Sequence, residues 1–221
     1  MAEDFWNIEI GDIDFDDDEK KLIVSQKSVP TRCIKYKNAE KLAKETDLNK
    51  NKRYECIIKG DFIYGDFIEA FFVENDIYTD ELTISTLSLG YENIDSINNL
   101  IMGGYVGKVR LLASVYFFAN ERKQGGIVDY LFKTIEKDRL QCAFADVHTK
   151  IVTFKTDDGK FVTIKGSANL RSSGCTENFT IEDDEELFNF YDSYHNDIFR
   201  IVEVRNEGNV VRKKVLNKQL K

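Results

Sequence analysis

Strand-like and helix-like patterns alternate along residues 53–147, and this alternation limits the folds that the chain can adopt. Apolar residues recur at helical spacing in three segments, 62–72, 93–101 and 126–136. Short runs typical of strands lie around them, at 54–60, 81–89, 108–118 and 141–147. Parallel strands need crossover connections, which helices usually supply. The order therefore predicts an α/β fold with a mixed, mostly parallel sheet flanked by helices.

A β-hairpin and a final helix are expected after this region. The runs 151–154 and 160–165 flank Asp158-Gly159, a dipeptide typical of two-residue hairpin turns. Segment 187–199 repeats apolar residues at helical spacing after a Glu-rich first turn. The chain thus returns through the hairpin to the edge of the sheet that it left.

Charge is distributed unevenly, although the net charge of -8 hides this. Residues 1–19 carry nine acidic residues and no base, whereas residues 20–59 carry twelve Lys or Arg against four acids. The chain therefore divides into an acidic leader (1–19), a basic N-terminal segment (20–59), a main domain (60–204) and a basic tail (205–221). A basic segment is compatible with a nucleic-acid surface, so nucleic acid is the expected partner.

Neither secretion nor a structural metal is indicated. The four cysteines are far apart and form no ligand pattern with the histidines: Cys33, Cys56, Cys142 and Cys175. The sequence has no basic, apolar, small-residue leader and no long uncharged apolar run. We expect a cytoplasmic protein that uses no metal or cofactor and has no membrane partner.

Chemically reactive residues are concentrated between positions 148 and 177. His148 and Lys150 precede the hairpin, the turn Gly166-Ser167-Ala168-Asn169 follows it, and Glu177 lies further on. We expect His148 and Lys150 to lie on one strand, to face the same way and to meet this turn. A site that cleaves a phosphodiester must neutralise its oxygens, present a nucleophile and protonate the departing alkoxide. These residues provide the required groups and form the expected active site.

The pattern resembles the signature of the phospholipase D superfamily, which is His-x-Lys, a hairpin, Gly-Ser-x-Asn and a downstream Glu. The resemblance covers residues 80–200. The family usually has Asp five positions after the Lys, where this chain has Lys155, and Asp157 or Asp158 replaces that acid or nothing does. The gap from Lys150 to Gly166 is also four residues longer than in the family. If each strand of the hairpin is two residues longer, the side chains of the hairpin that face inward still do so.

The resemblance implies a role for each motif residue. His148 would attack phosphorus and form a phosphohistidine, and Glu177 would accept the other ring N–H of a histidine. Four residues would bind the phosphate oxygens: Lys150, Gly166, Ser167 and Asn169.

A second histidine is needed as the acid, and chains of the superfamily with one motif pair as homodimers. We therefore predict a symmetric dimer that contributes His148 and Lys150 twice, while His195 is expected to be structural.

Three more residues are candidate substrate contacts: Arg171, Ser88 and Arg122. Each has a simpler interpretation. The arginines are equally typical of solvated charges, and Ser88, like Ser85 and Thr86, can satisfy the end of a strand.

Three functions stay open. The first is a metal-independent phosphodiesterase, an endonuclease that cleaves DNA or RNA, because small single-motif members of the superfamily are typically nucleases. The second is a non-catalytic nucleic-acid-binding or regulatory protein with the same fold, which Lys155 favours. The third is an interaction protein whose acidic leader covers its own basic surface until displaced.

Overall fold

The computed structural model describes residues 31–36, 38–48, 52–59, 62–171 and 174–202. The acidic leader, the first part of the basic segment and the basic tail lie outside these residues. The strands are β1 (Thr31–Tyr36), β2 (Arg53–Lys59), β3 (Thr79–Thr86), β4 (Val106–Ser114), β5 (Leu140–Ala145), β6 (Ile151–Lys155), β7 (Phe161–Gly166) and β8 (Thr176–Asp183). The helices are α1 (Ala39–Glu45), α2 (Tyr64–Glu74), α3 (Tyr91–Met102), α4 (Val115–Glu121), α5 (Ile127–Thr134) and α6 (Glu185–Ile201).

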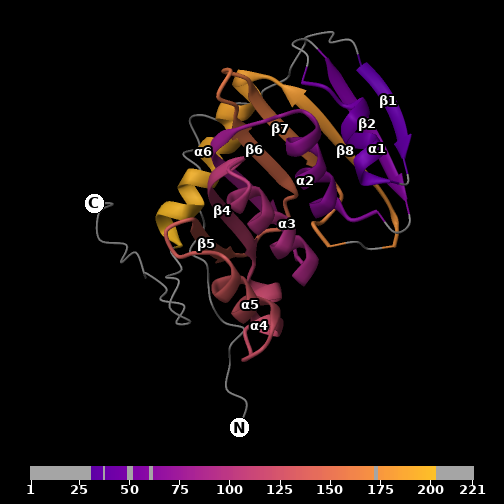
Figure 1. Cartoon of the computed structure of the whole chain (residues 1–221). Helices are drawn as coiled ribbons and strands as arrows, with labels where there is room; N and C mark the ends of the chain where they lie inside the picture. The colour runs from indigo at the N-terminus through magenta and orange to yellow at the C-terminus, as the bar shows by residue number, and fades with distance from the viewer. Residues whose placement is uncertain (1–30, 37, 49–51, 60–61, 172–173, 203–221) are drawn as a thin grey trace, which may run out of the picture.

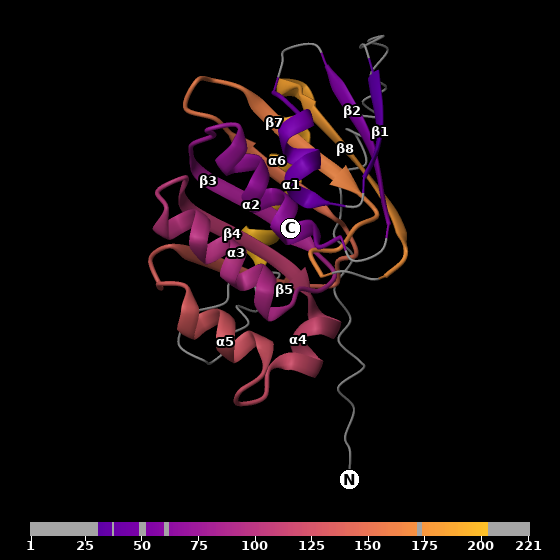
Figure 2. The same ribbon diagram turned by 45° about the vertical axis from the view of Figure 1, so that its right-hand side comes forward.

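All eight strands form one sheet in the order β1-β2-β8-β7-β6-β3-β4-β5 (Figure 1). The basic segment therefore contributes β1 and β2 to the same sheet as the predicted main domain. The sheet is twisted, so that β1 and β2 run at a steep angle to β4 and β5 (Figure 2). None of the helices in the described part of the chain is both long and apolar enough to cross a membrane.

The predicted α/β class and mixed sheet are confirmed, but the parallel pairs are a minority. Three pairings are parallel, β1 with β2, β3 with β4 and β4 with β5. The other four are antiparallel, because the hairpin β6–β7 and the following strand β8 lie between β3 and β2. Strands joined by short turns need no crossover helix and pair antiparallel. The hairpin itself is as expected, but its connection is longer than a two-residue turn, since five residues separate β6 from β7. Gly159 has a φ of 90° in this connection.

One predicted strand is only partly a strand. Segment 108–118 was expected to be continuous, whereas β4 ends at Ser114 and the next residues form α4. The hydroxyl of Ser114 accepts a hydrogen bond from the backbone N–H of Phe117 at 2.9 Å and caps the helix. A local cap therefore overrides the strand-like apolar pattern of residues 115–118.

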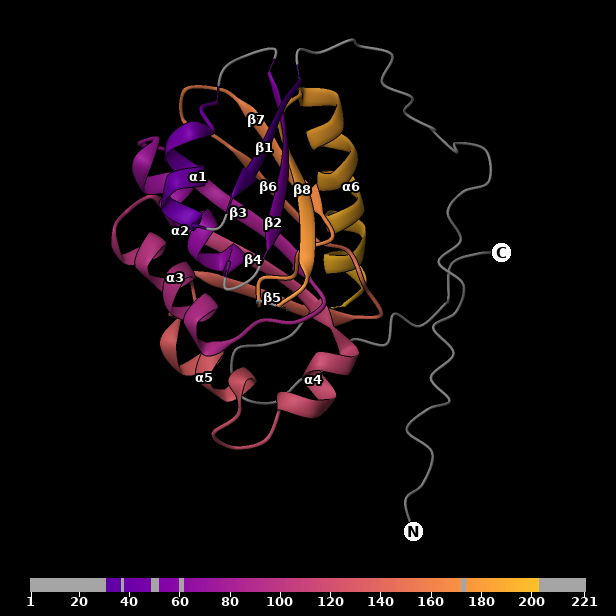
Figure 3. The same cartoon turned by 90° about the vertical axis from the view of Figure 1, so that its right-hand side faces the viewer.

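Helices cover both faces of the sheet, but unequally. Helices α1, α2, α3 and α5 lie on one face, and α6 lies alone on the other (Figure 3). The first face carries the main core, which is rich in fully buried aromatic side chains: Tyr54, Phe67, Phe71, Phe72, Phe154 and Phe179. The α6 face has a smaller cluster: Leu112, Ala143, Val147, Ile198 and Phe199.

Polar side chains form a row across the α6 face of the sheet. Directly paired residues of seven neighbouring strands make up this row, in the order Arg53, Glu182, Thr163, Thr153, Thr83, Arg110 and Gln141. At one end, the guanidinium of Arg53 donates to both carboxylate oxygens of the buried Glu182. Pairing of this kind makes the burial of a charge tolerable.

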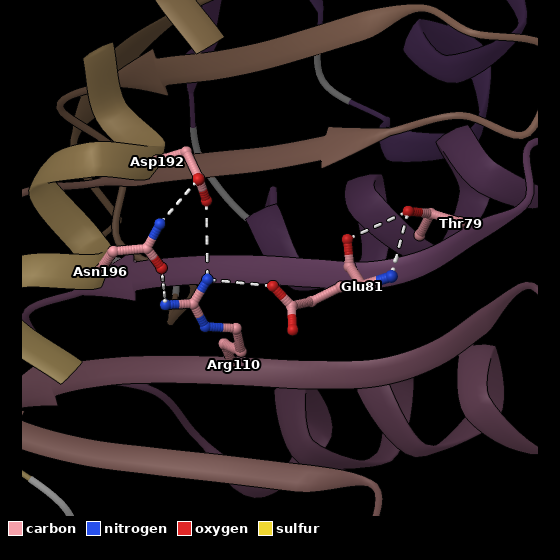
Figure 4. A network of polar contacts seen from close by, with 5 residues as sticks. All are labelled: Thr79, Glu81, Arg110, Asp192 and Asn196. Atoms are coloured by element: carbon pink, nitrogen blue, oxygen red, sulfur yellow. Dashed lines mark hydrogen bonds and ion pairs between the residues drawn. The ribbon is translucent and has the colours of Figure 1, made fainter. Parts of the chain in front are cut away.

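Arg110 links this row to α6 (Figure 4). Its guanidinium donates to Glu81 of β3 at 3.0 Å and to Asn196 of α6 at 2.6 Å, and it forms an ion pair with Asp192 at 3.6 Å. The same group lies 4.6 Å from the centre of the Phe199 ring. One arginine thus binds two strands and the helix that covers them.

Candidate functional site

The motif residues meet at one edge of the sheet, where β3 and β7 end and β6 and β8 begin. The strand register brings these ends together, since Ile151 pairs with both Ser85 and Lys165, and Gly166 pairs with Phe179. The His-x-Lys segment lies just before β6, and the Gly-Ser-Ala-Asn turn lies just after β7. Three segments of the chain therefore contribute side chains to this edge.

Lys150 and His148 contact each other. The Nζ atom of Lys150 lies 2.7 Å from Nδ1 of His148 and donates to the backbone oxygen of His148 at 2.8 Å. Both residues lie in the loop before β6 instead of on a strand as predicted, because strand pairing begins only at Ile151. The two side chains nevertheless face the same side of the segment, as predicted, since their nitrogen atoms contact each other.

The two residues differ in exposure, since His148 is exposed and Lys150 is only 8% exposed. Burial lowers the pKa of Lys150, and the negative charge of Glu177 raises it by a smaller amount. The edge therefore combines a partly desolvated cation with an accessible imidazole. A desolvated cation attracts an anion more strongly than one in water does.

The Gly-Ser part of the turn connects the His-x-Lys segment to β8. The backbone N–H of Gly166 donates to the Lys150 carbonyl at 3.1 Å, and that of Ser167 donates to the Asn178 carbonyl at 2.9 Å. A Cβ atom on Gly166 would lie 2.0 Å from the Asn178 oxygen and 2.6 Å from Cα of Phe179. Only glycine allows β7 and β8 to approach so closely.

Ser167 and Glu177 are joined by a hydrogen bond. The hydroxyl of Ser167 donates to the Glu177 carboxylate and accepts from the backbone N–H of Asn178 at 3.1 Å. Ser167 therefore holds Glu177 at the edge, a contact that the motif alone did not predict. The expected bonds of Ser167 to phosphate and of Glu177 to a histidine stay predictions.

Asn169 is anchored to the end of β3. Its side-chain oxygen accepts a hydrogen bond from the backbone N–H of Leu87 at 3.2 Å. The neighbouring Leu170 donates its backbone N–H to the Thr86 hydroxyl at 3.3 Å, and its side chain is buried. With the oxygen engaged, the NH₂ group of Asn169 is left to serve as the donor toward other acceptors.

The residue at the position of the family Asp lies away from this edge. Lys155 is the last residue of β6, about 13 Å along this five-residue strand from its first residue. Its ammonium lies 4.8 Å from the centre of the Phe161 ring. Asp158 accepts hydrogen bonds from Thr156 and Lys160 within the hairpin turn. Lys155 and Asp158 are therefore separate from the motif edge.

The candidate substrate contacts have different surroundings. Arg171 is exposed and directly follows the Gly-Ser-Ala-Asn turn. Ser88 is half-buried, and its backbone oxygen accepts from the Thr86 hydroxyl at 2.9 Å. Arg122 caps the end of α4, and its guanidinium lies 5.8 Å from the Phe118 ring centre. Arg171 is thus the nearest of the three to the motif along the chain.

Two groups at this edge were missed from the sequence. Thr149 donates its hydroxyl to Ser85 at 3.0 Å, and Leu87 contributes only a backbone N–H. The alternation of side chains indicates that Thr149 points away from His148 and Lys150, and this signal was available in the sequence. A backbone donor such as that of Leu87 leaves no signal in residue type.

His195 is not part of this cluster. It is a residue of α6, its side chain is 0% exposed, and neither ring nitrogen has a hydrogen-bond partner among the described residues. Burial, helped by the charge of Arg110, lowers the pKa of His195 to about 4. Its burial agrees with the predicted structural role. Among the described residues, no three His, Cys, Asp or Glu side chains are grouped to hold a metal ion.

No protein-family model matches the sequence, and no curated protein sequence matches it significantly. Several solved structures are similar in backbone arrangement. NucT from Helicobacter pylori is 18% identical, with 56% of this chain and 80% of that chain covered and a TM-score of 0.43. Nuc from Salmonella typhimurium, described as a phospholipase D family member, is 12% identical, with 58% and 84% covered and a TM-score of 0.44. Phosphatidylserine synthase from Haemophilus influenzae Rd KW20 is 15% identical, with 67% and 38% covered and a TM-score of 0.46.

Proposed function

We propose that this chain is a metal-independent phosphodiesterase of the phospholipase D superfamily, and that it acts as a cytoplasmic endonuclease on DNA or RNA. The observation that carries the proposal is the pair formed by Lys150 and His148, whose Nζ and Nδ1 atoms lie 2.7 Å apart beside the Gly-Ser-Ala-Asn turn. A buried cation, an accessible imidazole and an oriented amide donor are the groups required to bind and attack an anionic diester.

An entering phosphate would replace the contact between Lys150 and His148. The ammonium of Lys150 and the NH₂ group of Asn169 would bind the non-bridging oxygens, and the ring nitrogen of His148 would then be available. In the first step this nitrogen bonds to phosphorus as the bond to the leaving oxygen breaks, and an acid protonates that oxygen. In the second step the histidine that served as the acid takes a proton from a water molecule, whose oxygen bonds to phosphorus as the bond between phosphorus and His148 breaks. Glu177 would support the positive charge of a histidine.

The acid of the first step must come from a second histidine. The chain has only two histidines, and the side chain of His195, a residue of α6, is fully buried. We therefore propose a homodimer in which His148 of one copy attacks and His148 of the other copy protonates the leaving group. Static light scattering tests this directly, since a strict monomer at micromolar concentration would be unable to assemble the paired site.

A cleavage assay in EDTA tests the activity itself. Single- and double-stranded DNA and RNA are incubated with the wild type, His148→Ala and Lys150→Ala. Lys155→Ala is the matched control, because it removes a lysine from the same stretch of chain at the far end of β6. We expect cleavage by the wild type and the control only. If the wild type did not cleave, or if His148→Ala cleaved equally well, the proposed phosphodiesterase activity would be refuted.

The non-catalytic alternative is favoured by Lys155, which stands where the family has Asp. That residue lies at the end of β6 opposite to the motif, which weakens its bearing on the chemistry. The same proteins distinguish the two functions: the alternative predicts salt-sensitive binding to nucleic acid without any cleavage.

A further inference from the structure

We propose that Ser85 and Thr86 are positioning residues that hold the two halves of the motif in register at the end of β3. The inference rests on the proposed function for its catalytic consequence, while its structural part can be tested without activity. The halves are the His-x-Lys segment before β6 and the Gly-Ser-Ala-Asn turn after β7, and the hairpin is the direct covalent link between them.

Ser85 holds the His-x-Lys segment. It is 2% exposed, and its hydroxyl oxygen accepts a hydrogen bond from the Thr149 hydroxyl at 3.0 Å. Thr149 lies between His148 and Lys150, so its anchoring limits the movement of both neighbours. The hydroxyl of Tyr194 lies 3.5 Å from the same Thr149 oxygen, a longer contact that adds little.

Thr86 holds the Gly-Ser-Ala-Asn turn. It is 1% exposed, and its hydroxyl accepts from the backbone N–H of Leu170 while donating to the backbone oxygen of Ser88. The adjacent Leu87 reinforces this anchor through its bond to the Asn169 side chain. The hydroxyl of Thr86 is thus used as both donor and acceptor.

The arrangement follows from the geometry of a strand end. Successive side chains of a strand point to opposite faces of the sheet, so Ser85 and Thr86 reach two different segments. Ser85 is on the α6 face with Thr83, and Thr86 is on the face of the main core with Ile84. One strand end therefore sets the distance between the attacking ring and the amide that binds the phosphate. A misplacement of about 1 Å can lower a rate by on the order of a hundredfold.

The test compares Ser85→Ala and Thr86→Val with Thr163→Val. Thr163 is a matched control, because it is a buried threonine of β7 whose hydroxyl has no partner among the described residues. With a labelled oligonucleotide, we expect Ser85→Ala to lower kcat by roughly tenfold or more with little change in KM. Thr86→Val should weaken the binding of inorganic phosphate, and Thr86→Ser should restore it. Thr163→Val should behave as the wild type in both assays.

A second readout does not depend on catalysis. Burial lowers the pKa of Lys150, and NMR of its ¹³Cε-labelled side chain follows that titration. We expect Ser85→Ala to move this pKa upward, because a released segment lets water reach the ammonium. Thr149→Val removes the other partner of the bond and should shift the titration in the same direction, should Ser85→Ala fail to fold.

The outcomes separate this inference from the proposed function. If the wild type does not cleave, the proposed phosphodiesterase activity is refuted. The Lys150 titration still tests whether Ser85 positions the His-x-Lys segment. An unchanged Lys150 titration in the folded Ser85→Ala or Thr149→Val variant overturns the inference. Effects of Thr163→Val as large as those of Ser85→Ala overturn it as well, since they would reflect general loosening of the sheet.

Discussion

The backbone N–H of Leu87 donates to the side-chain oxygen of Asn169 at 3.2 Å, which gives the amide group of Asn169 a defined direction. The bond joins the end of β3 to a turn that is 82 residues further along the chain. This bond fixes which end of the amide faces Leu87, so the NH₂ group lies at the other end and can donate to a ligand. The Asn169 side chain is therefore oriented as a donor, which is the role that an anion requires.

Asn169→Asp tests this orientation. A carboxylate keeps an oxygen for Leu87 but replaces the donor group with a second negative oxygen. We expect a melting temperature close to that of the wild type and an affinity for inorganic phosphate at least about tenfold lower, since like charges repel. Calorimetry measures both quantities. Asn169→Ala, the control, should lose stability as well as binding. An Asp variant that binds phosphate as tightly as the wild type would contradict the assigned orientation.

Gly166→Ala should destabilise the fold strongly. The added Cβ would lie 2.0 Å from the Asn178 backbone oxygen, so β7 and β8 must separate. We expect the free energy of unfolding to fall by on the order of 3 kcal/mol, as for severe overpacking. Urea denaturation provides the measurement. Gly104→Ala is the control, because Gly104 has a φ of 77° but no atom within 4 Å of the added Cβ. Gly104→Ala should lower the free energy of unfolding by about 1 kcal/mol, which is the cost of placing a residue with a Cβ atom in the left-handed backbone conformation. Equal costs for both variants would argue against the close approach.

His195 should make the fold sensitive to acid. Its pKa is lowered from 6.5 to about 4 in the folded protein, so the unfolded chain binds the proton more readily. This contribution to stability is fully present above pH 6.5 and is lost as the pH falls through 4, to a total of about 3 kcal/mol. We expect His195→Leu to show a smaller loss of unfolding free energy between pH 7 and about pH 4 than the wild type. If the free energy of unfolding fell equally with decreasing pH in the two proteins, His195 would not titrate as described.

Arg110→Lys should weaken the attachment of α6. Lysine keeps the charge but cannot reach Glu81 and Asn196 together with a planar fork, and it loses the stacking on Phe199. We expect a loss of about 1–2 kcal/mol in the free energy of unfolding, limited by the partial exposure of the carboxylate partners. Chemical denaturation of Lys133→Ala provides the control, because Lys133 forms an exposed pair with Asp129. That variant should change stability by less than about 0.5 kcal/mol. If Arg110→Lys changed the free energy of unfolding by a similarly small amount, the contacts of Arg110 with Glu81, Asn196 and Phe199 would contribute little to stability.

The sequence by itself determined most of the local elements and the motif residues of the candidate site, although the contributions of Thr149 and Leu87 were not predicted from it. The period of apolar residues predicted α2, α3, α5 and α6, and Asp158-Gly159 predicted the hairpin, because these signals act between residues that are close along the chain. The motif likewise predicted that Lys150 and the Gly-Ser-Ala-Asn turn would meet, and the bond from Gly166 to the Lys150 carbonyl joins them.

Only the tertiary structure decided how distant strands align. Register between segments far apart in sequence places β8 antiparallel beside β2 and brings Thr149 to Ser85. It also forms the polar row from Arg53 to Gln141. Register depends on the packing of the whole sheet, since a shift by one residue would turn every side chain of a strand to the other face. The position of Lys155 at the far end of β6 follows from the same register. The residue types determine which functional groups the chain carries, whereas the register of the sheet determines which of those groups lie in contact.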